Sequence, residues 1–134
     1  MEFINPLTLN DPSGYGYSQL VVVPPNSRLV FVAGQGAGKV DGISYAEDFA
    51  EQVEQAFENL RAALSAIGAS PEDVVKITIL SVDHSDEKLQ IISQARRRFW
   101  PNGKPTSTLI PVPRLASAGM LFEIDAIAMI PDSE

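Results

Sequence analysis

The chain has 134 residues, a formal net charge of −7, no cysteine and one histidine. The absence of cysteine excludes disulfides and thiol catalysis, and a single histidine disfavours a zinc or iron site built from protein side chains. The acidic charge disfavours nucleic-acid binding, because affinity for a phosphate backbone comes largely from a basic surface.

A chain of this length is expected to form a single domain over residues 1–134. The sequence shows no long apolar span, signal peptide or low-complexity tract. We therefore expect a soluble, cytoplasmic protein with no membrane partner, no metal and no cofactor.

The first predicted elements are two β-strands, residues 18–23 (SQLVVV) and 28–34 (RLVFVAG), which the turn-forming PPNS separates. This spacing predicts a β-hairpin. The glycine-rich stretch that follows does not fit a phosphate-binding loop. If Lys39 were the lysine of such a loop, Ala33 would stand where the motif has its first glycine, and Val40 would stand where it has Ser or Thr. A glycine turn after the strand is the better interpretation.

A long amphipathic helix is predicted over residues 44–67, where apolar residues recur at three- and four-residue steps. Ser44 and Glu47 have the spacing of a capping box, and Gly68 is a natural stop. A third strand follows at 74–83, and His84 is expected to be a solvated loop residue.

The spacing of Leu89, Ile92, Ala95 and Phe99 predicts a second helix, with the run Arg96, Arg97, Arg98 near its end. Cations at a helix C-terminus suit the macrodipole, and we prefer this interpretation to RNA binding. Strands over roughly 106–113 and 120–130 complete an α+β fold of order β-β-α-β-α-β-β, with two helices on one face of the sheet.

The last strand presents a wholly apolar face at alternate positions from Met120 to Ile130, and its other face mixes Glu123 and Asp125 with apolar residues. The strand at 28–34 has no polar face either, so the uncovered side of the sheet is expected to be buried against other subunits. Glu123 and Asp125 would then lie near an interface. Each carboxylate could form a salt bridge at the interface or accept a hydrogen bond from the backbone. Alternatively, it could act as a general acid or base.

The segments GYGYSQ (14–19), VFVAGQ (30–35), EQVEQAFENLRAALSAIGAS (51–70), DVVKITIL (73–80) and FEIDAIA (122–128) together resemble the Rid family. This group of reactive-intermediate deaminases is also known as the YjgF family and as liver perchloric-acid-soluble ribonuclease (L-PSP). The resemblance covers about residues 14–130. It implies a homotrimer of chorismate-mutase-like subunits with a barrel-like core of sheets and small-molecule clefts between subunits.

The resemblance implies that, in the deaminase members, a cleft arginine binds the carboxylate of a 2-imino acid and a glutamate positions the hydrolytic water. Tyr17 matches the family's cleft tyrosine, Glu123 its catalytic glutamate, and Gly34 and Leu109 its backbone contacts. The arginine is expected two residues after Pro105, and this chain has Ser107 there.

Ser107 and its neighbour Thr108 can offer hydroxyls to a ligand, but neither provides the bidentate, charged grip of a guanidinium. Arg114 is a candidate substitute that we disfavour, because a similar arginine occurs in members that keep the cleft arginine. We therefore expect a trimer that binds a small polar or carboxylate metabolite without standard 2-imino acid deaminase activity.

Three alternatives stay open at this stage. The chain could be a hydrolase of a different enamine or imine that acts through Glu123 and water, or a non-catalytic regulatory trimer that binds a partner protein. A ribonuclease is the least favoured, given the charge of −7 and the lack of histidine at any matched cleft position.

Overall fold

The computed structural model describes residues 1–38 and 46–132. Its elements, in chain order, are β1 (Glu2–Ile4), η1 (Ser13–Tyr15), β2 (Leu20–Val22), β3 (Ser27–Gln35), α1 (Phe49–Ser65), η2 (Pro71–Asp73), β4 (Val74–Val82), α2 (Asp86–Phe99), β5 (Thr106–Val112) and β6 (Phe122–Pro131).

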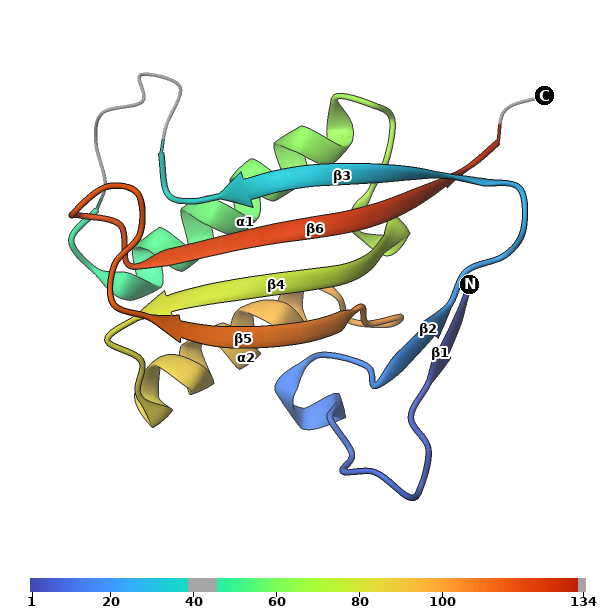
Figure 1. The fold of residues 1–134 in the computed structure, drawn as a ribbon, viewed down its shortest axis with the longest axis horizontal. Helices are drawn as coiled ribbons and strands as arrows, with labels where there is room; N and C mark the ends of the chain where they lie inside the picture. The colour runs from blue at the N-terminus through green and yellow to red at the C-terminus, as the bar shows by residue number, and fades with distance from the viewer. Residues whose placement is uncertain (39–45, 133–134) are drawn as a thin grey trace.

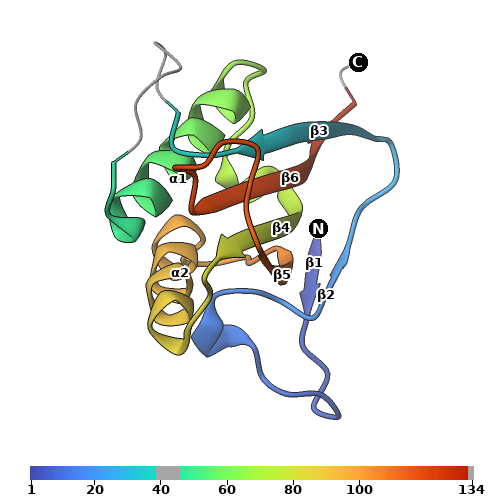
Figure 2. The same cartoon turned by 60° about the vertical axis from the view of Figure 1, so that its left-hand side comes forward.

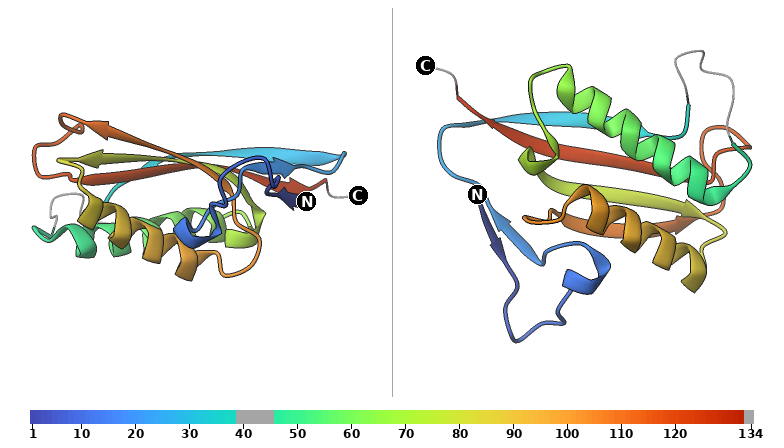
Figure 3. Two further views of the ribbon diagram at one scale, coloured as in Figure 1. Left: turned by 90° about the horizontal axis from the view of Figure 1, so that it is seen from below. Right: turned by 180° about the vertical axis from the view of Figure 1, so that it is seen from behind.

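The main sheet has the strand order β3-β6-β4-β5 (Figure 1). β6 pairs antiparallel with both β3 and β4, whereas β4 and β5 are parallel and α2 connects them. Both helices lie against one face of this sheet, and Figure 3 shows the opposite face open in the part of the chain that is drawn as ribbon. The predicted α+β architecture, a mixed sheet with two helices on one face, is therefore confirmed.

The predicted hairpin of the first two strands is wrong. β2 pairs antiparallel with β1, a three-residue strand that the sequence pattern did not indicate, and β3 pairs with β6 instead. The PPNS segment between β2 and β3 is consequently a link between two sheets. Pairing with β6 gives β3 a long apolar partner strand, which a short hairpin with β2 could not offer.

α1 begins at Phe49, later than the predicted start at residue 44. Asp48 is its N-cap and accepts a hydrogen bond from the Glu51 backbone N–H at 3.2 Å. Ser44, the predicted cap, lies outside the described residues. Gly68 ends the helix as predicted: its φ of +72° lets the Ala69 N–H reach the Leu64 carbonyl at 2.9 Å.

The core lies between the sheet and the two helices. Phe57 packs against Phe99, Trp100 and Phe122, with ring centroids 5.1 to 6.1 Å apart. The Trp100 indole donates a hydrogen bond to the Pro71 carbonyl at 2.8 Å, so this buried ring leaves no polar atom without a partner. Alternate residues of β6 are buried beneath the helices, as predicted.

Gln52 connects α1 to the segment that leads into β6. Its side-chain amide donates to the Ala46 and Gly119 carbonyls at 2.7 and 2.9 Å and accepts from the Leu121 N–H at 2.9 Å. Only 1% of Gln52 is exposed. Because a buried amide with all these partners resists displacement, it fixes where β6 begins and therefore where Glu123 stands.

Candidate functional site

A buried cation lies beneath the edge strand β5. Arg96, on α2, is only 3% exposed, and its Nη1 donates to the Ser107 hydroxyl at 2.9 Å. Its Nη2 is 3.4 Å from the Ser93 hydroxyl, and its guanidinium carbon is 5.4 Å from the centre of the Tyr17 ring. Nε has no hydrogen-bond partner among the described residues.

The charge of Arg96 is not neutralised within the described ranges. The ion pairs there join Arg28 to Asp132 and Arg61 to Glu58, and neither involves Arg96. Burial lowers the pKa of Arg96 to about 10, which still leaves the guanidinium charged at neutral pH. An uncompensated buried charge is unfavourable, so this arrangement is poised to accept an anion.

The segment before β2 covers this guanidinium. Gly16 has a φ of +83°, and a Cβ at this position would lie 2.8 Å from the Cβ of Arg96, so the loop approaches α2 more closely than a side chain permits. Ser18 then bridges to Thr106 and donates its N–H to the Pro105 carbonyl at 2.9 Å. These contacts hold Tyr17 beside Arg96, and Figure 2 shows the η1 segment next to α2.

The result is a pocket of about 260 Å³ at the β5 edge. It combines one guanidinium, a serine hydroxyl, two phenol rings and two leucine side chains. Its lining residues are Tyr15, Tyr17, Leu89, Arg96, Ser107 and Leu109. Such a lining suits a small molecule with one anionic or polar end and one apolar end.

A second group of site residues lies on the opposite face of the sheet. Glu123 is opposite Leu80 in the β4–β6 pairing, and its neighbour Ile124 points into the core. Gly34 lies directly against the Glu123 side chain: a Cβ on Gly34 would be 2.6 Å from the Glu123 carboxyl carbon. The absence of a side chain at Gly34 therefore sets the position of this carboxylate.

We expect Gly34→Ala to displace the Glu123 carboxylate while leaving the fold intact. The three atoms nearest to the added methyl all belong to the flexible Glu123 side chain, so the free energy of unfolding should change by less than about 1 kcal/mol. A crystal structure of the variant would show the new Glu123 rotamer. Gly14→Ala is the control, since a Cβ there meets nothing within 4 Å. If the Glu123 carboxylate keeps its position in the variant, Gly34 does not set that position.

Of the residues expected from the sequence, three come together: Tyr17, Ser107 and Leu109 line the pocket at β5. Thr108 is exposed and, being opposite Thr78, faces the other side of the sheet with Glu123. Arg114 donates to the Leu115 and Ala116 carbonyls of its own loop and does not line this pocket, so within one chain it does not replace the missing arginine.

Asp125 and Glu123 differ in their surroundings. The Asp125 carboxylate accepts the Thr78 N–H at 3.2 Å, which matches the backbone-bonded alternative. Glu123 makes no such contact among the described residues, and it remains the candidate general base.

Sequence reasoning missed Arg96. The run Arg96, Arg97, Arg98 predicts solvated cations at the end of a helix, and Arg97 and Arg98 are exposed as expected. The available signal was position: Arg96 follows Ile92 by four residues and precedes Phe99 by three, which places it on the buried stripe of α2.

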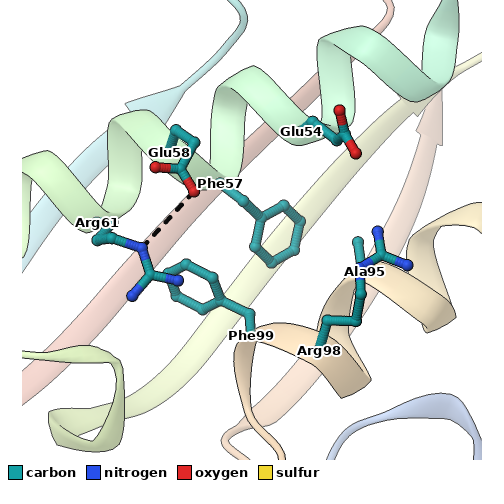
Figure 4. Close-up of a pocket in the computed structure, with 7 residues that line it drawn as sticks. All are labelled: Glu54, Phe57, Glu58, Arg61, Ala95, Arg98 and Phe99. Atoms are coloured by element: carbon teal, nitrogen blue, oxygen red, sulfur yellow. Dashed lines mark ion pairs between the residues drawn. The ribbon is translucent and has the colours of Figure 1, made fainter.

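Another hollow lies between α1 and α2 on the outer surface (Figure 4). Two of its charged groups are paired with each other: Arg61 lies 3.7 Å from Glu58 and also stacks over the Phe99 ring at 4.6 Å. The other cation that lines this groove, Arg98, is exposed to solvent, so the groove lacks the buried cation that marks the pocket at β5.

Neither a membrane-spanning helix nor a metal cluster is found in ranges 1–38 and 46–132. No helix there is long and apolar enough to cross a bilayer. No three His, Asp or Glu side chains there are grouped to hold a metal ion.

Residues 8–130 match the family described as Endoribonuclease L-PSP. The RutC family protein YjgH of Escherichia coli K12 is 36% identical over 104 residues, which cover 78% of this chain and 77% of that protein. The 2-iminobutanoate/2-iminopropanoate deaminase of Bos taurus is 30% identical over 124 residues, covering 91% and 86% of the two chains.

Solved structures agree with the sequence comparisons. The crystal structure of YyfB from Yersinia pestis, described as a conserved Rid family protein of unknown function, superposes with a TM-score of 0.90. The two sequences are 31% identical, and the match covers 96% of this chain and 98% of that one.

Proposed function

Because the chain belongs to the Endoribonuclease L-PSP family, whose members are also called Rid and YjgF proteins, we propose that it forms a homotrimer that binds a small polar or carboxylate metabolite in clefts between subunits. Its turnover of 2-imino acids is much slower than that of the deaminases. The observation that supports this proposal is the division of the site residues between the two faces of one sheet.

Within one chain, the pocket at β5 and the Gly34–Glu123 pair cannot serve the same ligand, because Ser107 faces the helices and Glu123 faces away from them. A second copy that packs on the open face would bring its own Glu123 toward the pocket at the β5 edge. That open face is apolar enough to require a partner: Phe31 is 73% exposed and Leu29 is 56% exposed.

Slow turnover follows from Ser107. The strand position that presents a guanidinium to the substrate in the deaminases here presents a hydroxyl, and loss of a well-placed charged donor reduces rate or affinity by about 30- to 1,000-fold. Arg96 lies beneath the strand instead of on it, so its charge is offered from a different direction.

A second candidate function is hydrolysis of a different imine or enamine, favoured by the placement of Glu123 against Gly34. In that reaction Glu123 takes a proton from water as the oxygen adds to the C=N carbon. The nitrogen gains a proton from solvent as the carbinolamine forms and then the proton held by Glu123, after which the C–N bond breaks and ammonia leaves. The hydroxyl releases its proton to solvent, which leaves a carbonyl group on the product. Ribonuclease activity is disfavoured despite the family's description, because a net charge of −7 repels RNA.

The test compares this protein with the bovine deaminase on freshly generated 2-iminobutanoate and 2-iminopropanoate, measuring ammonia release. We expect the rate to be lower by about 30-fold or more, for lack of the strand guanidinium. Solution scattering on the same sample should give about three times the chain mass of 14.5 kDa. Turnover equal to that of the bovine enzyme, or a monomeric mass, would refute the proposal.

A further inference from the structure

Arg96 has hydrogen-bonding capacity that the described residues do not use. A guanidinium carries five N–H donors, and those of Arg96 meet two serine hydroxyls while Nε has no partner. Both hydroxyl contacts are to neutral groups, so the positive charge has no counter-ion in the described ranges.

The groups around Arg96 suit a carboxylate. A carboxylate can accept from the guanidinium and from the hydroxyls of Ser107 and Tyr17 together, since a serine oxygen that accepts from Arg96 still has a proton to donate. Beyond these polar groups, Leu89, Leu109 and the Tyr15 ring provide an apolar wall for a short hydrocarbon chain.

We infer that Arg96 binds the carboxylate of a small monocarboxylate ligand, and that α2 supplies the cation that β5 lacks at Ser107. The inference deepens the proposed function and rests on it, because it names the residue and the ligand class for the same cleft. Arg96 is thus a specificity residue: it selects anions over neutral isosteres.

Butyrate and its neutral isostere butyramide are the probes, added to the assembled protein in thermal-unfolding and calorimetric titrations. Butyrate should bind and raise the unfolding temperature, and butyramide should not. Arg96→Met should weaken butyrate binding by about 30-fold or more, the usual effect of removing one partner of a buried charged pair. Arg98→Met removes the same charge from an exposed position of α2 and should leave binding unchanged.

A measurement on the wild-type protein covers the case in which Arg96→Met does not fold. The Arg96 Nε–H resonance, assigned with Arg96→Lys, should shift in an NMR titration with butyrate and stay in place with butyramide. An unshifted resonance at saturating butyrate would overturn the inference.

The outcomes separate the two proposals. Binding of butyramide as tight as that of butyrate, or butyrate binding that survives Arg96→Met, overturns the role of Arg96 but leaves a ligand-binding cleft in place. Arg96→Met that breaks up the assembly without any ligand also overturns it, because the counter-ion would then be a carboxylate of the partner subunit. A monomeric wild-type protein that binds neither probe overturns the proposed function itself.

Discussion

Replacing Phe31 with aspartate is expected to leave the protein as a monomer of 14.5 kDa. Phe31, on the edge strand β3, is 73% exposed on the open sheet face, where it pairs with Ile127 of β6. If that face is the subunit interface, each copy of the variant would bury a carboxylate among apolar side chains, at roughly several kcal/mol per copy. Sedimentation velocity at micromolar concentration would measure the mass directly.

The matched control is Ile67→Asp. Ile67 is also apolar and 45% exposed, but it lies after α1 on the helical side of the molecule. This variant should keep the mass of the wild type. A Phe31→Asp protein that still sediments as a trimer would show that the open face is not the interface, and the inter-subunit cleft would have to be abandoned.

In the proposed trimer, the division of the site between two sheet faces would link function to assembly. Ser107 accepts a hydrogen bond from Arg96, and the Glu123 side chain lies against Gly34, so each half of the site is formed within its own chain. What one chain leaves undefined is the distance between the halves. If a second chain packs on the open face as proposed, it would set that distance, and small changes at the interface would alter the chemistry without altering either half of the site.

Alternation of side chains in β6 could be read from the sequence because one face must be wholly apolar beneath two helices. The partner of β2 could not be predicted in this way. β2 and β1 are three residues each, so their pairing depends on tertiary contacts that leave little periodic signal. An adjacent strand was the default expectation, and here β3 had a longer apolar partner in β6.

Arg96 shows a different limit of sequence reasoning. Helical spacing places it on the buried stripe of α2, but charged residues are rarely fully buried, so solvation at the helix end was the natural expectation. The hydroxyls that accept hydrogen bonds from its guanidinium belong to Ser93, one turn away, and to Ser107, on another element. Only the packing of α2 under β5 reveals that the serine and the arginine occupy one site.

Moving the cation from the helix to the strand should create imino acid turnover. Ser107→Arg alone would place two guanidiniums in contact, since Arg96 Nη1 already lies 2.9 Å from the Ser107 hydroxyl, and we expect it to be destabilised. Ser107→Arg combined with Arg96→Ser relieves that repulsion. The double variant should release ammonia from 2-iminobutanoate about 30- to 1,000-fold faster than the wild type.

Glu123 decides whether that gain is hydrolysis in the proposed cleft. Adding Glu123→Gln to the double variant removes the base and keeps the shape, and should reduce the gained rate by about 100-fold or more. Asp125→Asn is the matched control, because its side-chain oxygen can still accept the Thr78 N–H while the carboxylate charge is lost. Equal losses from both changes would mean that charge near β6, and not a base at Glu123, limits the rate. If a well-folded double variant shows no increase in ammonia release, the missing strand guanidinium is not the reason for the slow turnover of this chain.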